Sequence, residues 1–243
     1  MADLLPKTAM YDYQKYAAEY ITNHSIAAVF LECGLGKTVI SLTALDELMF
    51  DYFTVHKALV ICPLRIGLNV WKQECGKWEH LRHFECAIAI GDVKTRLDAL
   101  RKKADIYIIN RENTQWLVEK CGKRWPFDTV VLDESSSFKN HQAKRFKALK
   151  TVRPRINRMI ELTGTPNPHG LMDLWAQLYL LDGGQRLGRT ISVYRDMYFN
   201  PDKRNATTIF SYAPKEGAEQ VIQKQISDIC ISMKASDYLD LPE

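Results

Sequence analysis

Residues 31–38 read Leu31-Glu32-Cys33-Gly34-Leu35-Gly36-Lys37-Thr38, and they join two apolar segments. Residues 26–30 before them are apolar throughout, which is typical of a buried strand, and residues 39–45 after them are typical of a helix. A strand, a glycine-containing turn that ends in Lys-Thr, and the start of a helix together predict a phosphate-binding loop. The two glycines let the backbone turn its N–H groups inward, and the helix start adds a positive dipole end.

This loop predicts a site for a triphosphate and Mg²⁺. The residues expected to hold the nucleotide are Gly34, Leu35, Gly36, Lys37 and Thr38. Lys37 is expected to reach the β- and γ-phosphates, and the Thr38 hydroxyl to hold Mg²⁺. Leu31 stands where the general pattern has glycine, so the turn should differ from the commonest form. A chance Gly-x-Gly-Lys-Thr sequence is the alternative, and the flanking strand and helix disfavour it.

The bulk composition is that of an ordinary globular protein. Of the 243 residues, 46% are hydrophobic and 26% are charged, and the length suits one large α/β domain or two small ones. The six cysteines form no C-x-x-C pair and no metal-ligand spacing, so we expect reduced thiols and a cytoplasmic protein. No apolar stretch approaches the roughly 20 residues of a membrane span, and no membrane partner is expected.

Strand and helix patterns alternate along the chain. Further strands are expected at residues 57–63, 86–91, 105–109, 128–132, 158–162 and 228–234. Helices are expected at residues 10–22, 68–78, 93–103 and 171–181, with a loop at 64–67 and a small helical insertion at 185–227. This alternation predicts an α/β fold, a mostly parallel sheet with helices on both faces. Ligands in such sheets bind beyond the carboxyl ends of the strands.

The strand expected at 128–132 delivers two carboxylates, Asp133 and Glu134, to that edge. In a phosphate-loop NTPase the first carboxylate holds the Mg²⁺ shell, and the second can orient and deprotonate the attacking water. A solvated acidic turn is the alternative, which the loop upstream disfavours. Residues 135–160 then contain eight Lys or Arg and no Asp or Glu. Part of this stretch is expected to be a solvated helix face, and part could follow a phosphate backbone.

Taken in order, these motifs resemble the Swi/Snf-type DNA translocases of helicase superfamily two. The resemblance is to the first of their two RecA-like ATPase lobes, and it covers nearly all of residues 1–243. Besides the loop and the acid pair, it rests on Lys139-Asn140 and on Leu162-Thr163-Gly164-Thr165-Pro166. The resemblance implies ATP as the nucleotide, with Gln14 reading the adenine edge. It also implies nucleic-acid contacts by Pro63, Arg65, Asn110, Arg111, Lys139 and Asn140.

The chain departs from this family pattern after the acid pair. Ser135-Ser136 stands where the family often has Ala-His, a variant similar to some bacterial and phage members. The resemblance implies that Ser136, Thr163 and Thr165 couple the nucleotide state to DNA binding. If the protein is phage-encoded, its place would be the host cytoplasm or nucleoid.

The second lobe of the family, with its arginine finger, is expected to lie outside these 243 residues. It would come from the same chain or another one, and the piece itself is expected to be a monomer. Without an arginine finger, hydrolysis should fall by about 10³–10⁵-fold, so we expect weak ATP binding and little turnover.

Three functions fit the sequence. The favoured one is the ATP-binding lobe of a DNA-dependent ATPase that moves along or remodels duplex DNA. The alternatives are a nucleotide-gated nucleic-acid-binding module without hydrolysis and a strand-separating helicase.

Overall fold

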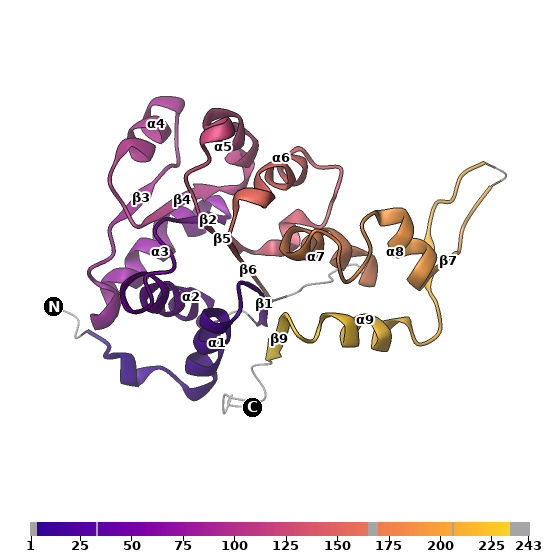
Figure 1. The fold of residues 1–243 in the computed structure, drawn as a ribbon, viewed down its shortest axis with the longest axis horizontal. Helices are drawn as coiled ribbons and strands as arrows, with labels where there is room; N and C mark the ends of the chain where they lie inside the picture. The colour runs from indigo at the N-terminus through magenta and orange to yellow at the C-terminus, as the bar shows by residue number, and fades with distance from the viewer. Residues whose placement is uncertain (1–3, 33, 165–169, 206, 234–243) are drawn as a thin grey trace.

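The computed structural model describes residues 4–32, 34–164, 170–205 and 207–233. Its centre is a seven-stranded sheet with the order β3-β4-β2-β5-β6-β1-β9, in which every pair is parallel (Figure 1). The strands are β1 (Ile26–Leu31), β2 (Ala58–Cys62), β3 (Cys86–Ile88), β4 (Ile106–Asn110), β5 (Thr129–Asp133), β6 (Arg158–Thr163) and β9 (Cys230–Met233). The α/β fold with a parallel sheet is therefore confirmed.

Helices cover both faces of this sheet. One face packs against α1 (Asp12–Asn23), α2 (Lys37–Asp46) and α3 (Leu64–Lys77). The other face packs against α4 (Val93–Arg101), α5 (Thr114–Cys121), α6 (Lys144–Val152), α7 (Leu174–Asp182), α8 (Ile191–Tyr198) and α9 (Ala218–Ile226). The central strands are apolar and buried along their length because both of their faces are covered. None of the helices in the described ranges combines the length and apolar composition that a membrane crossing requires.

The strand register brings three strand ends to one level. Phe30 of β1 pairs with Thr163 of β6, and Asp133 of β5 pairs with Leu162 of β6. Because these strands are parallel, the segments that follow β1, β5 and β6 leave the sheet at the same edge. The loop before α2 and the acid pair after β5 therefore face the same side of the molecule.

The loop expected at residues 64–67 is wrong, because α3 begins directly after Pro63. In the structure Gly67 lies within the helix and faces the sheet, where an added Cβ would lie 2.6 Å from Ile90 Cδ1 and 2.9 Å from Cys62 Sγ. The glycine allows close packing of the helix on the sheet. The sequence analysis also gave no helix at α5.

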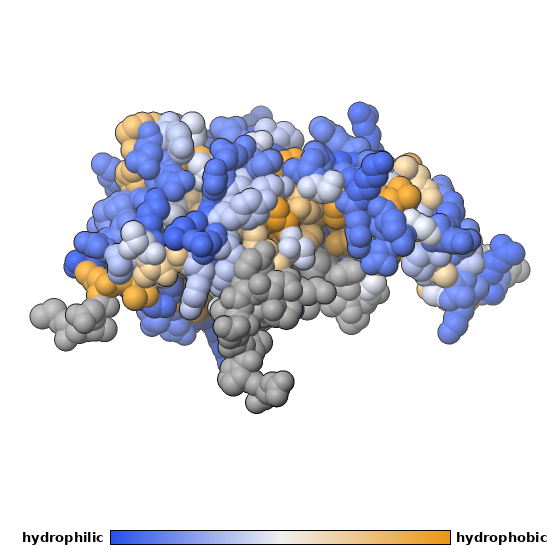
Figure 2. Space-filling view, turned by 90° about the horizontal axis from the view of Figure 1, so that it is seen from below, coloured by the Kyte–Doolittle hydropathy of each residue, from blue (hydrophilic) through white to orange (hydrophobic). Residues whose placement is uncertain are grey.

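The segment 185–227, where a small helical insertion was expected, contains α8 and α9, and also a feature that was not predicted. Strands β7 (Phe199–Pro201) and β8 (Tyr212–Pro214) form a short antiparallel hairpin. Figure 1 shows the hairpin projecting away from the sheet. The chain then returns through α9 to β9, which pairs with β1. The face seen in Figure 2 is mostly hydrophilic, with apolar residues near its middle and at its left end.

Candidate nucleotide-binding site

The turn after β1 has the backbone that a phosphate-binding loop requires. Gly34 and Gly36 have φ values of +89° and +82°, a conformation that favours glycine. Gly36 is the N-cap of α2, and an added Cβ there would lie 2.4 Å from Gln14 Nε2. Leu31, the departure from the usual pattern, is the last residue of β1 and is fully buried. Residue 31, where the usual pattern has glycine, is thus still part of the strand. Cys33 lies outside the described residues.

Lys37 extends from the first turn of α2 back along the loop. Its Nζ donates to the carbonyls of Leu31, at 2.9 Å, and Glu32, at 3.4 Å, and lies 4.0 Å from Glu134 Oε1. Only 11% of the Lys37 side chain is exposed. The ammonium group is therefore held between the loop and the acid pair.

The acid pair occupies an unusual turn at the end of β5. Asp133 is only 4% exposed, and Trp71 Nε1 on α3 donates to its Oδ2 at 2.9 Å. Burial raises the pKa of Asp133 to about 6, although the Trp71 hydrogen bond and Lys37 act in the opposite direction. Glu134 has φ 58° and ψ 59°, a left-handed conformation that costs a residue other than glycine about 1–3 kcal/mol. Such strain is found most often at functional sites.

The loop and the acid pair line one cavity of about 350 Å³, which we call the loop cavity. Its lining residues are Gly34, Gly36, Lys37, Thr38, Val39, Ile66, Val70, Glu74, Lys77, Asp133 and Glu134. The two segments that the sequence analysis assigned to one site therefore lie together. Their chemical roles stay predictions.

The donors in the loop cavity fit a magnesium nucleotide. Thr38 and Asp133 supply the oxygen ligands that Mg²⁺ prefers. In the described part of the chain, no three His, Cys, Asp or Glu side chains gather as a metal site. This donor set suits Mg²⁺, which in proteins usually takes one or two side-chain oxygens and completes its shell with water and substrate phosphates.

Gln14 lies directly against the loop, although its amide faces the protein. The side chain is buried, its Oε1 accepts from the Tyr11 backbone N–H at 3.0 Å, and its Nε2 donates to the Leu35 carbonyl at 3.2 Å. These bonds tie the start of α1 to the turn. The adenine-reading role of Gln14 stays a prediction.

The residues expected to contact nucleic acid lie along one edge of the sheet. Pro63 directly follows β2, and Asn110 is the last residue of the adjacent strand β4, where it pairs with Cys62. Arg65 is exposed in the first turn of α3. Asn110 Nδ2 and Arg111 Nε both donate to the Glu112 carboxylate, at 2.8 and 3.0 Å.

The second pair of these residues follows β5. Lys139 Nζ lies 3.1 Å from Asp173 Oδ2, and Asn140 Oδ1 accepts from the Gln142 backbone N–H at 2.9 Å. These residues thus have hydrogen-bond or ion-pair partners or a capping position within the protein, and the Arg65 side chain is exposed.

The predicted coupling residues surround the acid pair only in part. Thr163 is buried at the end of β6, and Ser136 lies in the short 3-10 helix that follows Glu134. Thr165 lies outside the described residues. Ser135, Trp71 and Gln177 were not among the predicted site residues. Ser135 Oγ donates to Gln177 Oε1 at 3.0 Å. Nothing in the helical spacing of Trp71 or Gln177 distinguishes them from ordinary core residues.

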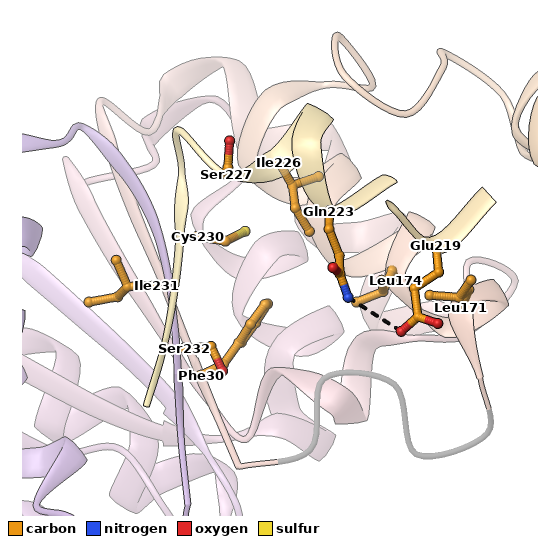
Figure 3. Close-up of a pocket in the computed structure, with 10 residues that line it drawn as sticks. All are labelled: Phe30, Leu171, Leu174, Glu219, Gln223, Ile226, Ser227, Cys230, Ile231 and Ser232. Atoms are coloured by element: carbon orange, nitrogen blue, oxygen red, sulfur yellow. Dashed lines mark hydrogen bonds between the residues drawn. The ribbon is translucent and has the colours of Figure 1, made fainter. Parts of the chain in front are cut away.

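A second, larger cavity of about 460 Å³ shares no lining residue with the loop cavity. We call it the α9 cavity, because α9 supplies one wall and Phe30 of β1 lies on the other side (Figure 3). On α9, Gln223 Nε2 donates to Glu219 Oε1 at 3.3 Å. The remaining lining is mainly apolar, so this cavity lacks the converging charges of the loop cavity.

Comparisons with known proteins agree with this geometry. Residues 15–210 match the family model described as the SNF2-related domain. Putative protein p41 of Acyrthosiphon pisum secondary endosymbiont phage 1 is 35% identical over 237 residues, which are 95% of this chain and 52% of that protein. The helicase swr1 of Aspergillus fumigatus is 27% identical over 194 residues, 76% of this chain and 11% of that protein. The chain thus spans about half the length of the phage relative and much less of the helicase.

Two solved structures share the fold. The Sulfolobus solfataricus SWI2/SNF2 ATPase core in complex with dsDNA superposes with a TM-score of 0.73 at 22% identity, over 97% of this chain and 46% of that chain. The core domain from the same organism gives a TM-score of 0.72 at 24% identity, with the same shares covered.

Proposed function

The chain belongs to the SNF2-related domain family, and on that premise we propose that it is the ATP-binding lobe of a DNA-dependent ATPase that moves along duplex DNA. The observation that carries this proposal is the loop cavity. It brings the turn at Lys37 and Thr38 to the carboxylates of Asp133 and Glu134. A positively charged helix start opposite two acids is the arrangement that phosphoryl transfer to water needs.

Each of these side chains has a role in the proposed reaction. Lys37 binds the β- and γ-phosphates, and its ammonium group already lies between the loop and Glu134. Thr38 and Asp133 would hold Mg²⁺, which would supply positive charge to neutralise the phosphates. Glu134 would orient the attacking water and accept its proton, since its side chain lines the same cavity as Lys37 and Thr38.

We further propose that residues 1–243 form the first of two RecA-like lobes, with 185–227 as an insertion. The chain spans 46% of the solved core and 52% of the phage relative, which leaves length in those proteins for a second lobe. That lobe, in the same or another chain, would complete the ATP site and the DNA track. Arg65, Arg111 and Lys139 at the strand ends would face the duplex. A phage relative favours action in a bacterial cytoplasm.

Calorimetric titration of the 243-residue chain with Mg-ATP tests the nucleotide site. Lys37→Ala should weaken binding at least about tenfold, because a buried charge-assisted contact is lost. Lys15→Ala is the control, since Lys15 pairs with exposed Asp12 and is not among the residues that line the loop cavity. Unchanged affinity in Lys37→Ala would overturn the proposed site.

The remaining alternatives separate by assays on longer protein. With a second lobe supplied, DNA-stimulated phosphate release is expected. A module that only binds would show nucleotide-dependent DNA affinity without release. Displacement of a triplex strand without unwinding of the duplex favours a translocase over a strand-separating helicase.

A further inference from the structure

The strained turn that carries the acid pair is buried on both sides of Glu134. We call residues 133–135 the acidic turn. Glu134 at its centre has the left-handed backbone, and its neighbours Asp133 and Ser135 are 4% and 0% exposed. A conformation of this kind persists only where the surrounding contacts over-determine it. Contacts from both helical layers hold the acidic turn in this conformation.

From one helical layer the contact is Trp71 of α3. Its side chain is fully buried, and its Nε1 donates to Asp133 Oδ2 at 2.9 Å. Helix α3 belongs to the face of the sheet that α1 and α2 also cover. This bond fixes one carboxylate oxygen of Asp133, whose side chain lines the loop cavity.

From the opposite layer the contact is Gln177 of α7. Gln177 is 1% exposed, and its Oε1 accepts from Ser135 Oγ at 3.0 Å. Its amide cannot turn over freely, because Nε2 donates to the Asp173 carbonyl at 3.0 Å. The Asp173 carboxylate in turn pairs with Lys139 at 3.1 Å, so the same helix start connects the acidic turn to a residue at the proposed DNA edge.

We propose that Trp71 and Gln177 are positioning residues, which hold the acidic turn from opposite faces of the sheet and thereby aim Asp133 and Glu134 into the loop cavity. Neither side chain lines that cavity, so both act through the turn. The inference rests on the proposed function, because it gives the turn its purpose. The claim that these two residues hold the turn can be tested in protein without nucleotide.

A first test uses ligand-free protein and the indole N–H signals of its five tryptophans in ¹H–¹⁵N spectra. Trp71→Phe assigns the Trp71 signal by its disappearance. Ser135→Ala removes the contact of the opposite layer, and it is expected to shift the Trp71 indole signal through the turn. The Trp175 indole, which donates to the Gly188 carbonyl, should stay in place. A Trp71 signal that does not move in Ser135→Ala would overturn the proposal.

A second test separates positioning from general stability. Trp71→Phe keeps a buried aromatic ring but loses the indole donor and the volume of the second ring. Mg-ATP affinity should fall about five- to tenfold while ATP affinity in EDTA stays within twofold. Trp175→Phe is the matched control, because it removes an indole hydrogen bond of an equally buried tryptophan outside the loop cavity. Equal losses with and without Mg²⁺, or none in either state, would contradict the proposal.

Gln177→Met provides a further variant if Ser135→Ala fails to fold, because it removes the other side of the same hydrogen bond. It should shift the Trp71 indole signal as Ser135→Ala does, and a Trp71 signal that stays in place would again contradict the proposal. Should the wild-type chain not bind ATP at all, the proposed function fails, whereas the ligand-free spectra still decide the positioning role.

Discussion

The loop cavity and the α9 cavity teach different things about what marks a site. The α9 cavity is the larger, at about 460 Å³ against about 350 Å³, and it is mainly apolar. The loop cavity contains a glycine turn, a lysine, two acids and a strained glutamate. Charges that converge on a strained backbone indicate chemistry, whereas volume between packed elements does not. Four experiments test this contrast.

The largest expected effect is on the rate of phosphate release, when an acid of the loop cavity is compared with an acid of the α9 cavity. Glu134→Gln should lower DNA-stimulated phosphate release about 10²–10⁴-fold, because the proposed base is lost, while ATP affinity changes little. Glu219→Gln in the α9 cavity should leave the rate unchanged. The measurement is single-turnover phosphate release with the second lobe supplied. Comparable losses in the two variants would remove the distinction between the cavities.

Two glycines with similar backbones provide the next comparison. Gly36 and Gly217 have φ values of +82° and +73°, and each is the N-cap of a helix. An added Cβ at Gly36 meets Gln14 Nε2 at 2.4 Å, whereas at Gly217 it meets no described atom within 4 Å. Urea unfolding should show a loss of about 2–3 kcal/mol for Gly36→Ala and about 1 kcal/mol for Gly217→Ala. Equal losses would mean that the Gln14 side chain moves away at little cost, and that the loop is not tightly packed against it.

Glu161 of β6 lies between the two regions and predicts a pH effect. It is fully buried, and burial raises its pKa well above the ordinary 4.5, with Asp182 adding to the shift and Ser135 and Arg153 opposing it. Its charge also helps to raise the pKa of Cys230, which lines the α9 cavity. Because the folded state holds this proton more tightly than the unfolded chain, wild-type stability should fall as the pH rises above about 4.5.

Glu161→Gln keeps the shape and removes the titration. The variant should gain stability relative to wild type as the pH rises, with a limiting slope of about 1.4 kcal/mol per pH unit, and the difference should level off below the unfolded pKa. Urea unfolding from pH 4 to pH 8 measures it. A stability difference that does not vary with pH would show that Glu161 is ionised in the folded state.

The sequence predicted the loop region far better than the insertion, and the reason is physical. Residues 31–38 and the acid pair follow strands whose apolar pattern is local and unambiguous, so the parallel sheet and its ligand edge could be inferred. Trp71 and Gln177 could not, because each occupies a core position and its role depends on a contact with a distant element. The hairpin of β7 and β8 has strands of three residues each, too short to give a periodic signal. The close packing of Gly67 could not be predicted for the same reason, because it involves Ile90 and Ile108, which are distant in the sequence.

The smallest effect concerns DNA. Lys139→Ala removes one cation from the proposed DNA edge, and it also breaks the ion pair with Asp173, which should cost stability less than about 1 kcal/mol. DNA affinity should fall about threefold, and the slope of log affinity against log salt should fall by about one. Lys203 in the projecting hairpin segment is exposed and is the matched control. If Lys203→Ala lowers the affinity and the salt slope as much as Lys139→Ala does, the insertion also contacts the duplex, and the functional contrast between the two regions would hold for ATP chemistry alone.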